Sequence, residues 1–276
     1  MKRTMQVWVA LAILVSTARQ ASAIEFTSTL SSIKVRVRPG EVVTRSFELH
    51  LAGGQQAAAR FHSHVEDWWQ SEDGAQSFYR PAGTLAHSCG TWITLDPVET
   101  AVEPGGLLSV RITAAIPRHV APGGYWCVLT VDELPDPLAN QSGVDMRFVA
   151  SVSTGIFLYV EPVQRDLRVA SVDLSARQAR LLLRNVGNAP VAFQGRIDVL
   201  NAGDGKVAAT APLQRMTVLT EPISSRLVTV ALPDLAALPP GRYVAQVVLD
   251  IGLDHDIGVR KELVLPDDLL PTPKAP

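Results

Sequence analysis

The sequence of 276 residues predicts an all-β protein, because two kinds of strand pattern recur along it. Short apolar runs alternate with period two, as in Ile33-Lys34-Val35-Arg36-Val37, which is typical of strands with one buried face. A Pro-Gly turn followed by a tyrosine and a strand occurs twice, at 122–131 and at 240–250. In the first copy Tyr125 lies two residues before Cys127, the pattern of a tyrosine corner in an immunoglobulin-like sandwich. The repeat predicts two tandem immunoglobulin-like β-sandwich domains.

We expect the first domain at residues 24–161 and the second at residues 162–265. No segment shows the 3.6-residue period of an amphipathic helix, and glycine or proline separates most apolar runs. In the first domain, strands are expected at 33–37, 43–51, 58–68, 89–95, 107–115, 125–131 and 144–160, with a polar turn and an irregular section from 71 to 83. In the second domain, strands are expected at 167–174, 179–185, 191–200, 216–219, 226–232, 243–250 and 259–265, followed by a disordered tail at 266–276.

Composition and charge argue against several classes of function. The chain is 47% hydrophobic and 19% charged, which indicates a globular protein. Its formal net charge is −2 and the sequence has no basic stripe, so no nucleic-acid partner is expected. The sequence also lacks a phosphate-binding loop, a dinucleotide fingerprint and the Gly-x-Ser-x-Gly motif of hydrolases. We therefore predict a protein that is not an enzyme and uses no cofactor.

Residues 1–23 have the pattern of a secretory signal peptide. Lys2 and Arg3 precede an apolar run at 7–15, and Ala21-Ser22-Ala23 is a small-residue cleavage site. The mature chain is expected to begin near Ile24 and to be periplasmic or secreted, with no membrane insertion after signal removal. A retained N-terminal anchor is the alternative, although the apolar run is short for a bilayer.

Export changes the expected role of the two cysteines, Cys89 and Cys127. Outside the cytoplasm, such a pair more often forms a disulfide than a metal site or a redox centre. The cysteines are 38 positions apart, and closing that loop would stabilise the fold by about 4 kcal/mol. This spacing is shorter than in antibody-type domains, so the bridge should join Cys127 to a strand other than the usual partner. Two buried free thiols are the alternative.

Few polar clusters are candidates for chemistry. His62 and His64 would share one face of a strand, with Asp67 nearby, and could bind a metal. The alternative is two solvent-facing histidines on an edge strand. Because no third ligand lies at a spacing that defines a tetrahedral site, we predict no metal. The segment 254–256 is expected at a polar hairpin tip, and His87 near a cysteine is expected to have no catalytic role.

The tryptophans of the first domain need a separate explanation. Trp92 and Trp126 are expected in the core. The adjacent residues Trp68 and Trp69 cannot both point inward on a regular strand, because successive side chains alternate between faces. One of them should be exposed, or covered by the Phe78-Tyr79 segment. An exposed tryptophan beside an irregular loop would be a secondary contact with a partner.

Several short segments of the first domain occur together in one order. They are Trp92-Ile93-Thr94-Leu95-Asp96-Pro97, Val102-Glu103-Pro104-Gly105, Ile116-Pro117, Tyr125-Trp126, Leu134-Pro135 and Phe157-Leu158-Tyr159-Val160-Glu161-Pro162. Over residues 32–162 the chain resembles the N-terminal domain of periplasmic pilus-assembly chaperones. A weaker resemblance is to two-domain Gram-positive surface proteins that bind the cell wall, which share the Trp-Ile, Pro-Gly and Pro-Gly-x-Tyr rhythm.

The chaperone resemblance implies β-strand addition, in which a client strand pairs with an exposed sheet edge. The final strand of the first domain is the expected edge, with an alternating apolar row for partner binding: Met146, Phe148, Ala150 and Val152. The alternative is that this row fills the core of its own domain.

The sequence departs from the family at the anchor for the client's terminal carboxylate. The family uses an arginine in the first strand and a lysine in the last strand. Here Phe157 or a neighbour stands at the place of the lysine, and Lys34 or Arg36 is a loose match for the arginine.

The leading hypothesis is an exported, non-catalytic, chaperone-like binding protein. Its partner would be a client strand of a pilin-like or surface subunit, and it would assist the assembly of pili or surface fibres. The alternative is a structural or adhesive cell-envelope protein that binds peptidoglycan or another surface component.

Overall fold

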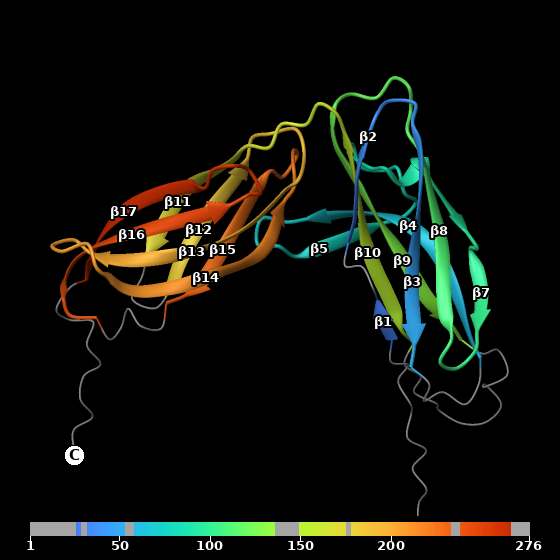
Figure 1. Ribbon diagram of the computed structural model, residues 1–276, viewed down its shortest axis with the longest axis horizontal. Helices are drawn as coiled ribbons and strands as arrows, with labels where there is room; N and C mark the ends of the chain where they lie inside the picture. Colours follow the sequence, from blue (N-terminus) through green and yellow to red (C-terminus); the bar gives the residue numbers. More distant parts are fainter. Residues whose placement is uncertain are drawn as a thin grey trace, which may run out of the picture.

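The computed structural model describes residues 26–28, 32–52, 58–135, 149–174, 178–232 and 238–265. These residues form two β-sandwiches (Figure 1). The first contains β1 (Phe26–Ser28), β2 (Ser32–Val37), β3 (Val42–Leu51), β4 (Ala59–Gln70), β5 (Gln76–Tyr79), the 3₁₀ turn η1 (Gly90–Trp92), β6 (Ile93–Asp96), β7 (Glu99–Val102), β8 (Leu107–Ala115), β9 (Gly123–Leu134) and β10 (Ser151–Val160). The second contains β11 (Leu167–Leu174), β12 (Gln178–Asn185), β13 (Val191–Asn201), β14 (Val207–Val218), β15 (Ser225–Ala231), β16 (Gly241–Asp250) and β17 (Ile257–Leu265).

The predicted signal peptide at 1–23 and the predicted tail at 266–276 lie outside the described residues. Among the residues that are described, there is no helix with the length and apolar character needed to cross a membrane.

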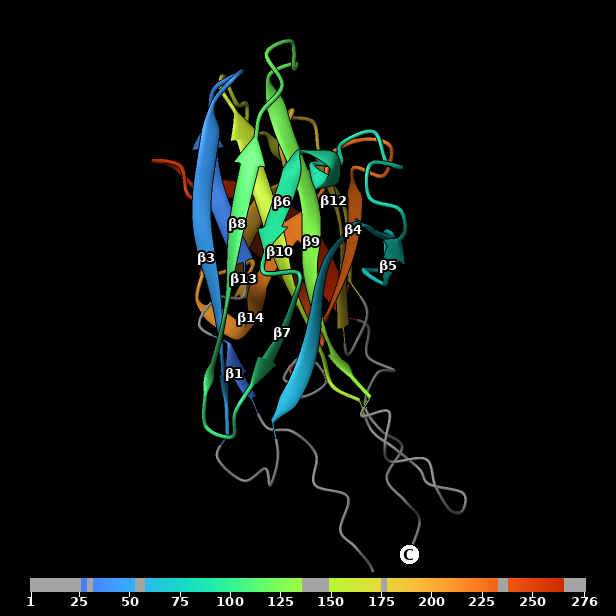
Figure 2. The ribbon, with the colours of Figure 1, turned by 90° about the vertical axis from the view of Figure 1, so that its right-hand side faces the viewer.

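Two sheets enclose the core of the first sandwich. One sheet has the order β1-β3-β8-β6, and Figure 2 shows β3, β8 and β6 side by side. The other has the order β2-β10-β9-β4-β5, and β7 also pairs with β4. In β8 the side chains of Leu108, Val110 and Ile112 are buried, whereas Ser109 and Arg111 between them are exposed. This is the period-two pattern from which the sequence predicted strands with one buried face.

The second sandwich packs the sheet β11-β12-β15 against the sheet β14-β13-β16-β17. Its largest difference from the prediction is β14, expected only at 216–219 but beginning at Val207. β14 lies at a sheet edge, and its buried row includes Ala209, Ala211 and Leu213. Small alanines and Pro212 weaken the strand signal in the sequence, whereas an edge strand accepts a proline because one row of its amides needs no partner.

Both predicted turn-tyrosine elements form tyrosine corners. The Tyr125 hydroxyl donates to the carbonyl of Ala121 at 3.1 Å, and the Tyr243 hydroxyl donates to the carbonyl of Pro239 at 2.8 Å. In each case the acceptor lies four residues upstream of the tyrosine. The two sandwiches therefore have the same hydrogen-bonded turn at the start of corresponding strands, β9 and β16. The predicted fold of two tandem immunoglobulin-like sandwiches is confirmed.

The segment from 71 to 102 contains elements that the sequence did not reveal. β5 forms a hairpin with β4 where an irregular section was expected, and β7 pairs with the first residues of β4. Cys89 was expected on a strand, but it lies in the loop before η1. It forms a disulfide with Cys127 on β9, and the two Cα atoms are 5.4 Å apart.

A buried carboxylate organises the loop that leads to Cys89. Asp67 is 1% exposed and accepts hydrogen bonds from the N–H groups of Gly83 at 3.0 Å, Thr84 at 2.6 Å and Leu85 at 2.8 Å. It also accepts a hydrogen bond from the Ser88 hydroxyl. Asp67 is paired in register with Tyr79 of β5, directly after the segment of β4 that pairs with β9, so its carboxylate connects the loop to the sheet of β2, β10, β9, β4 and β5.

Candidate functional site

The two sandwiches meet at a hinge formed by the start of β9 and the turn between β12 and β13. The Gly124 N–H donates to the Asn188 carbonyl at 2.8 Å. A Cβ atom on Gly124 would lie 2.9 Å from the Cα of Ala189, so only glycine lets the two backbones approach this closely. The Asn188 side chain also accepts from the Gln164 N–H at 2.7 Å, which connects the interdomain link to the same turn.

A second contact comes from the hairpin of β4 and β5, Trp68–Tyr79, which we call the bridging hairpin. It extends from the first sandwich toward the second (Figure 1). At its turn, the carbonyl of Glu72 accepts a hydrogen bond from the N–H of Leu227 at 2.7 Å. Gly74, with φ +95°, lies against the guanidinium of Arg226, where a side chain would overlap it. Hinge and bridging hairpin therefore bound a cleft between the sandwiches.

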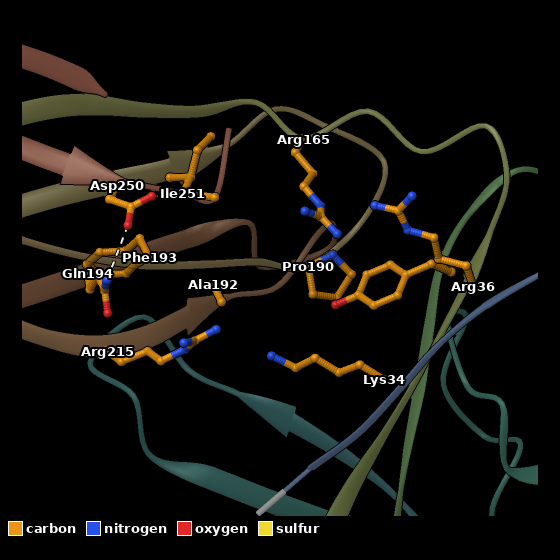
Figure 3. A pocket seen from close by; sticks show the side chains of 12 residues that line it. Lys34, Arg36, Arg165, Pro190, Ala192, Phe193, Gln194, Arg215, Asp250 and Ile251 are labelled. Atoms are coloured by element: carbon orange, nitrogen blue, oxygen red, sulfur yellow. Dashed lines mark hydrogen bonds between the residues drawn. The ribbon is translucent and has the colours of Figure 1, made fainter. Parts of the chain in front are cut away.

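Cationic side chains from both sandwiches converge in this cleft. Lys34 on β2, Arg165 in the interdomain link and Arg215 on β14 line a cavity of about 320 Å³. In Figure 3 their charged ends point toward one another, with Arg36 beside Arg165. Arg36 forms an ion pair with Glu161 at 3.6 Å, whereas Lys34, Arg165 and Arg215 have no ion-pair partner among the described residues.

Aromatic rings support two of these cations. The Lys34 ammonium lies 5.7 Å from the centre of the Phe157 ring, and the Arg165 guanidinium lies 5.6 Å from the centre of the Tyr159 ring. Burial lowers the pKa of Lys34, and the positive charges of Arg215 and Arg165 lower it further. A bound anion would relieve this repulsion, so these cations are chemically suited to a negatively charged group.

The acidic residue on the cavity wall does not neutralise this cluster. Asp250 lies at the far side of the cavity from Lys34 in Figure 3. Its carboxylate accepts hydrogen bonds from the Gln194 amide at 3.1 Å and from the Gly252 N–H at 2.7 Å. The Asp250 carboxylate is thus hydrogen-bonded to neutral donors and not to the cations. The cations remain available for a carboxylate or a similar anion, which arginine can bind with two parallel hydrogen bonds.

The predicted apolar row is only partly described. Met146 and Phe148 lie outside the described residues. Ala150 is half-buried, and its N–H donates to the Glu133 carboxylate at 3.2 Å. Val152 is half-buried and packs on the core of its own sandwich, as the alternative interpretation held for the row.

The expectation that the final strand is a free edge is wrong for most of β10. From Gly155 to Val160, β10 lies between β9 and a parallel β2. Before that point, no described strand pairs with the outer side of Ser151–Ser153. The open part of the edge is thus confined to the start of β10.

Neither Trp68 nor Trp69 is exposed, and of the two alternatives, exposure or cover by the Phe78-Tyr79 segment, the structure shows cover, because Phe78 lies opposite Trp68. They are 8% and 6% exposed. Trp68 is paired in register with Phe78 on β5 and packs edge-on against Phe157 at 6.1 Å between ring centres. Trp69 packs against Trp126 at 5.2 Å. Both tryptophans belong to an apolar cluster that includes Ala189 and Leu219 of the second sandwich. Successive side chains of β4 point to opposite faces, so contacts beyond the sheet itself are needed to bury both tryptophans.

The two histidines of β4 are not the solvent-facing pair of an edge strand. β4 is paired with β9 on one side and with β7 and β5 on the other. The His64 side chain is 14% exposed, and its ring nitrogens lie 3.6 Å from the carboxylates of Glu66 and Asp132. Asp67 is engaged in the loop and does not join the histidines. The described residues contain no group of three potential ligands that could hold a metal ion.

Sequence reasoning missed Arg165 and Arg215. Arg165 lies in the link after the first domain, and Arg215 lies on the unpredicted part of β14. Neither is near Lys34 in the sequence, and neither belongs to a motif. The one sequence feature that pointed to this site was the loose match of Lys34 to the family's anchoring arginine. The two arginines lie near Lys34 only because the second sandwich packs against the first.

The chain therefore belongs to the class of all-β proteins that consist of two tandem immunoglobulin-like sandwiches with a cleft between them. Within that class, the chain is similar in fold to periplasmic pilus-assembly chaperones. A chain of the chaperone–tip adhesin complex of CFA/I fimbriae aligns with a TM-score of 0.50 and 9% identity, covering 86% of this chain and 98% of that chain. For the class 5 fimbriae chaperone CfaA the TM-score is 0.49, with 10% identity and coverage of 86% and 99%.

The chaperone–tip subunit complex CsuC–CsuE from Acinetobacter baumannii gives a TM-score of 0.46, with 16% identity and coverage of 87% and 98%. No protein-family model and no curated protein sequence matches the chain. At this level of identity the similarity shows the fold and does not by itself show the function.

Proposed function

We propose that this protein is an exported, non-catalytic chaperone that holds a pilus or surface-fibre subunit by the subunit's C-terminal strand. The observation that carries the proposal is the cationic cleft. Lys34, Arg165 and Arg215 come from two sandwiches and the link between them, and they face one cavity with no ion-pair partner among the described residues. The terminal carboxylate of a protein chain is an anion that suits such a site.

The adjoining sheet edge would hold the rest of the client strand. β2 covers β10 only from Gly155 onward, and Lys34 on β2 is in register with Phe157. A client strand that paired with β10 beside Ser151–Ser153, and ended in the cleft, would run parallel to β10. Its backbone would add a strand to the sheet, and Met146 and Phe148 remain the proposed apolar contacts at the entry to this edge.

The fold comparison supports a protein client. The similar structure with a TM-score of 0.50 is a complex between a chaperone and a tip adhesin. We propose the same class of partner here, together with a periplasmic location that follows from the signal-peptide pattern of residues 1–23.

A pair of peptides tests the anchor. The probe is a soluble peptide of alternating apolar residues, prepared with a free C-terminal carboxylate and as the C-terminal amide, and binding is measured by fluorescence anisotropy. Charge-assisted hydrogen bonds predict that the acid binds about 10- to 100-fold more tightly than the amide. Lys34→Ala and Arg215→Ala should remove most of that difference. Arg111→Ala is the matched control, because Arg111 is an exposed arginine on the sheet of the first sandwich that does not include β2 and β10. Equal binding of acid and amide would refute the anchor.

A second experiment tests the edge in the native host. Phe148→Asp should weaken co-purification of the client by roughly 10- to 100-fold, because burial of a large apolar side chain stabilises by about 1.5–3 kcal/mol. A thermal melt of the same variant is the control for folding. Undiminished co-purification with an unchanged melt contradicts strand addition at this edge. Retention on purified peptidoglycan, independent of Lys34 and Arg215, would instead favour the envelope-binding alternative.

A further inference from the structure

A second cavity, of about 340 Å³, adjoins the cationic one. Its floor is formed by Trp68, Val128 and Phe157, which are 8%, 4% and 6% exposed. Phe78 on β5 and Met216 on β14 form walls from the two sandwiches. Unlike the rest of the sheet face, where Glu66, Asp132 and His64 cluster, this cavity has no acidic lining residue.

The two cavities share two residues, Lys34 and Arg215. A group held by these cations therefore lies at the boundary between the cavities. If the group is the carboxylate of a chain's last residue, the side chain on the adjacent Cα is within reach of the second cavity.

The bridging hairpin holds the apolar wall in place. Its turn is hydrogen-bonded to the second sandwich through Glu72 and Leu227, and pairing with β4 places Phe78 directly opposite Trp68. Phe78 is nonetheless 47% exposed, so a large ring at the cavity wall has an unfilled side. An exposed aromatic ring beside an apolar floor is characteristic of a binding site.

We infer that this second cavity holds the side chain of the client's C-terminal residue, and that it selects a large apolar residue, aromatic above all, at that position. The inference rests on the proposed function and specifies the client's chemistry. An aromatic ring would meet Trp68 and Phe157, which already pack edge-to-face, and would lie next to the cations Lys34 and Arg215. A C-terminal lysine or arginine is disfavoured, because the cavity offers two cations and no carboxylate.

The test uses peptides that are identical except for the last residue, which is phenylalanine, alanine or lysine, each with a free carboxylate. The phenylalanine peptide is also made as the amide. Binding to the full-length mature protein is measured by fluorescence anisotropy. The phenylalanine acid should bind about 10- to 100-fold more tightly than the alanine acid, from burial of the ring. The lysine acid should bind no better than the alanine acid.

Two variants of neighbouring residues give the structural control. Phe78→Ala should reduce the preference for phenylalanine over alanine to a few-fold, without removing the preference for acid over amide. Tyr79→Ala is the matched control, because Tyr79 is the next residue of β5, is 41% exposed and lines neither cavity. It should leave both preferences unchanged, and thermal melts of both variants should match the parent protein.

The outcomes separate this inference from the proposed function. If the three acids bind equally but better than the amide, the carboxylate anchor holds and the side-chain cavity is refuted. If acid and amide bind equally, while Phe78→Ala abolishes a preference for phenylalanine, the cavity stands and the anchor is refuted. A preference for phenylalanine that survives in Phe78→Ala and also in Trp68→Leu refutes the cavity, and no binding by any peptide at millimolar concentration refutes both.

Discussion

Removing the Asp67 carboxylate should make the first sandwich unfold at a much lower denaturant concentration. Asp67 lies between Glu66 and Trp68 on β4, and its side chain accepts hydrogen bonds from three consecutive backbone N–H groups of the loop at 83–85 and from the Ser88 hydroxyl. Asp67→Ala leaves those donors without an acceptor and leaves a small cavity beneath the loop.

The size of the effect follows from the number and burial of these donors. A hydrogen bond to a charged group contributes about 1.5–3 kcal/mol, and four of them would be comparable to the whole stability of a typical domain if they were additive. They are not additive here, because Gly83 and Thr84 are exposed and water can solvate their N–H groups once the loop opens. The buried share corresponds to a loss of about 3–5 kcal/mol. Asp67→Asn keeps one acceptor oxygen and should lose about half as much.

Tryptophan fluorescence in a urea titration measures this loss through probes that all belong to the first sandwich. Apart from Trp8, all tryptophans of the chain lie in the first sandwich, at positions 68, 69, 92 and 126. With a slope of about 2 kcal/mol per molar urea, the midpoint should fall by roughly 1.5–2.5 M. Asp96→Ala is the control, since the Asp96 carboxylate is 67% exposed and its contact is an ion pair of 3.6 Å with Arg111. A midpoint for Asp67→Ala no lower than that of Asp96→Ala would refute the anchoring role.

Four further predictions follow from contacts in the two sandwiches. Replacing Cys89 and Cys127 together by alanine should lower the stability of the first sandwich by about 4 kcal/mol, because the bridge closes a loop of 38 residues; an unchanged fluorescence midpoint would contradict this. Because the pKa of Lys34 is lowered, binding of a free-acid peptide should weaken with rising pH before the ordinary lysine pKa is reached, and Lys34→Arg should abolish this pH dependence in calorimetric titrations. Tyr243→Phe should cost about 1 kcal/mol by removing the second tyrosine corner, visible as a lower calorimetric melting temperature. Burial and the Arg80 charge lower the pKa of His64, so its contribution to stability is complete above the ordinary histidine pKa and is lost as pH falls below it; urea midpoints between pH 7 and pH 5 should fall less in His64→Gln than in the parent protein.

The sequence alone determined the fold class and the turn-tyrosine elements. These depend on short-range signals: a strand with one buried face must alternate, and a tyrosine corner needs only a tyrosine four residues after its acceptor. The hydroxyls of Tyr125 and Tyr243 form the predicted bonds for this reason. Local signals failed where an element depends on its neighbours. The edge strand β14 with Pro212, and the exposed strand β5, are strands because of what they pair with rather than because of their own composition.

Only the tertiary structure decided where the cleft lies and what lines it. Lys34, Arg165 and Arg215 belong to a strand, a link and a strand of the other sandwich, and no spacing in the sequence relates them. The approach of Gly124 to Asn188 and the contact of the bridging hairpin with Leu227 bring the three cations together and bury Trp68 and Trp69. Because like charges repel, the three cations would not come together through their own interactions. The packing of one sandwich against the other holds them in place, and that packing is a sum of contacts between residues far apart in the chain.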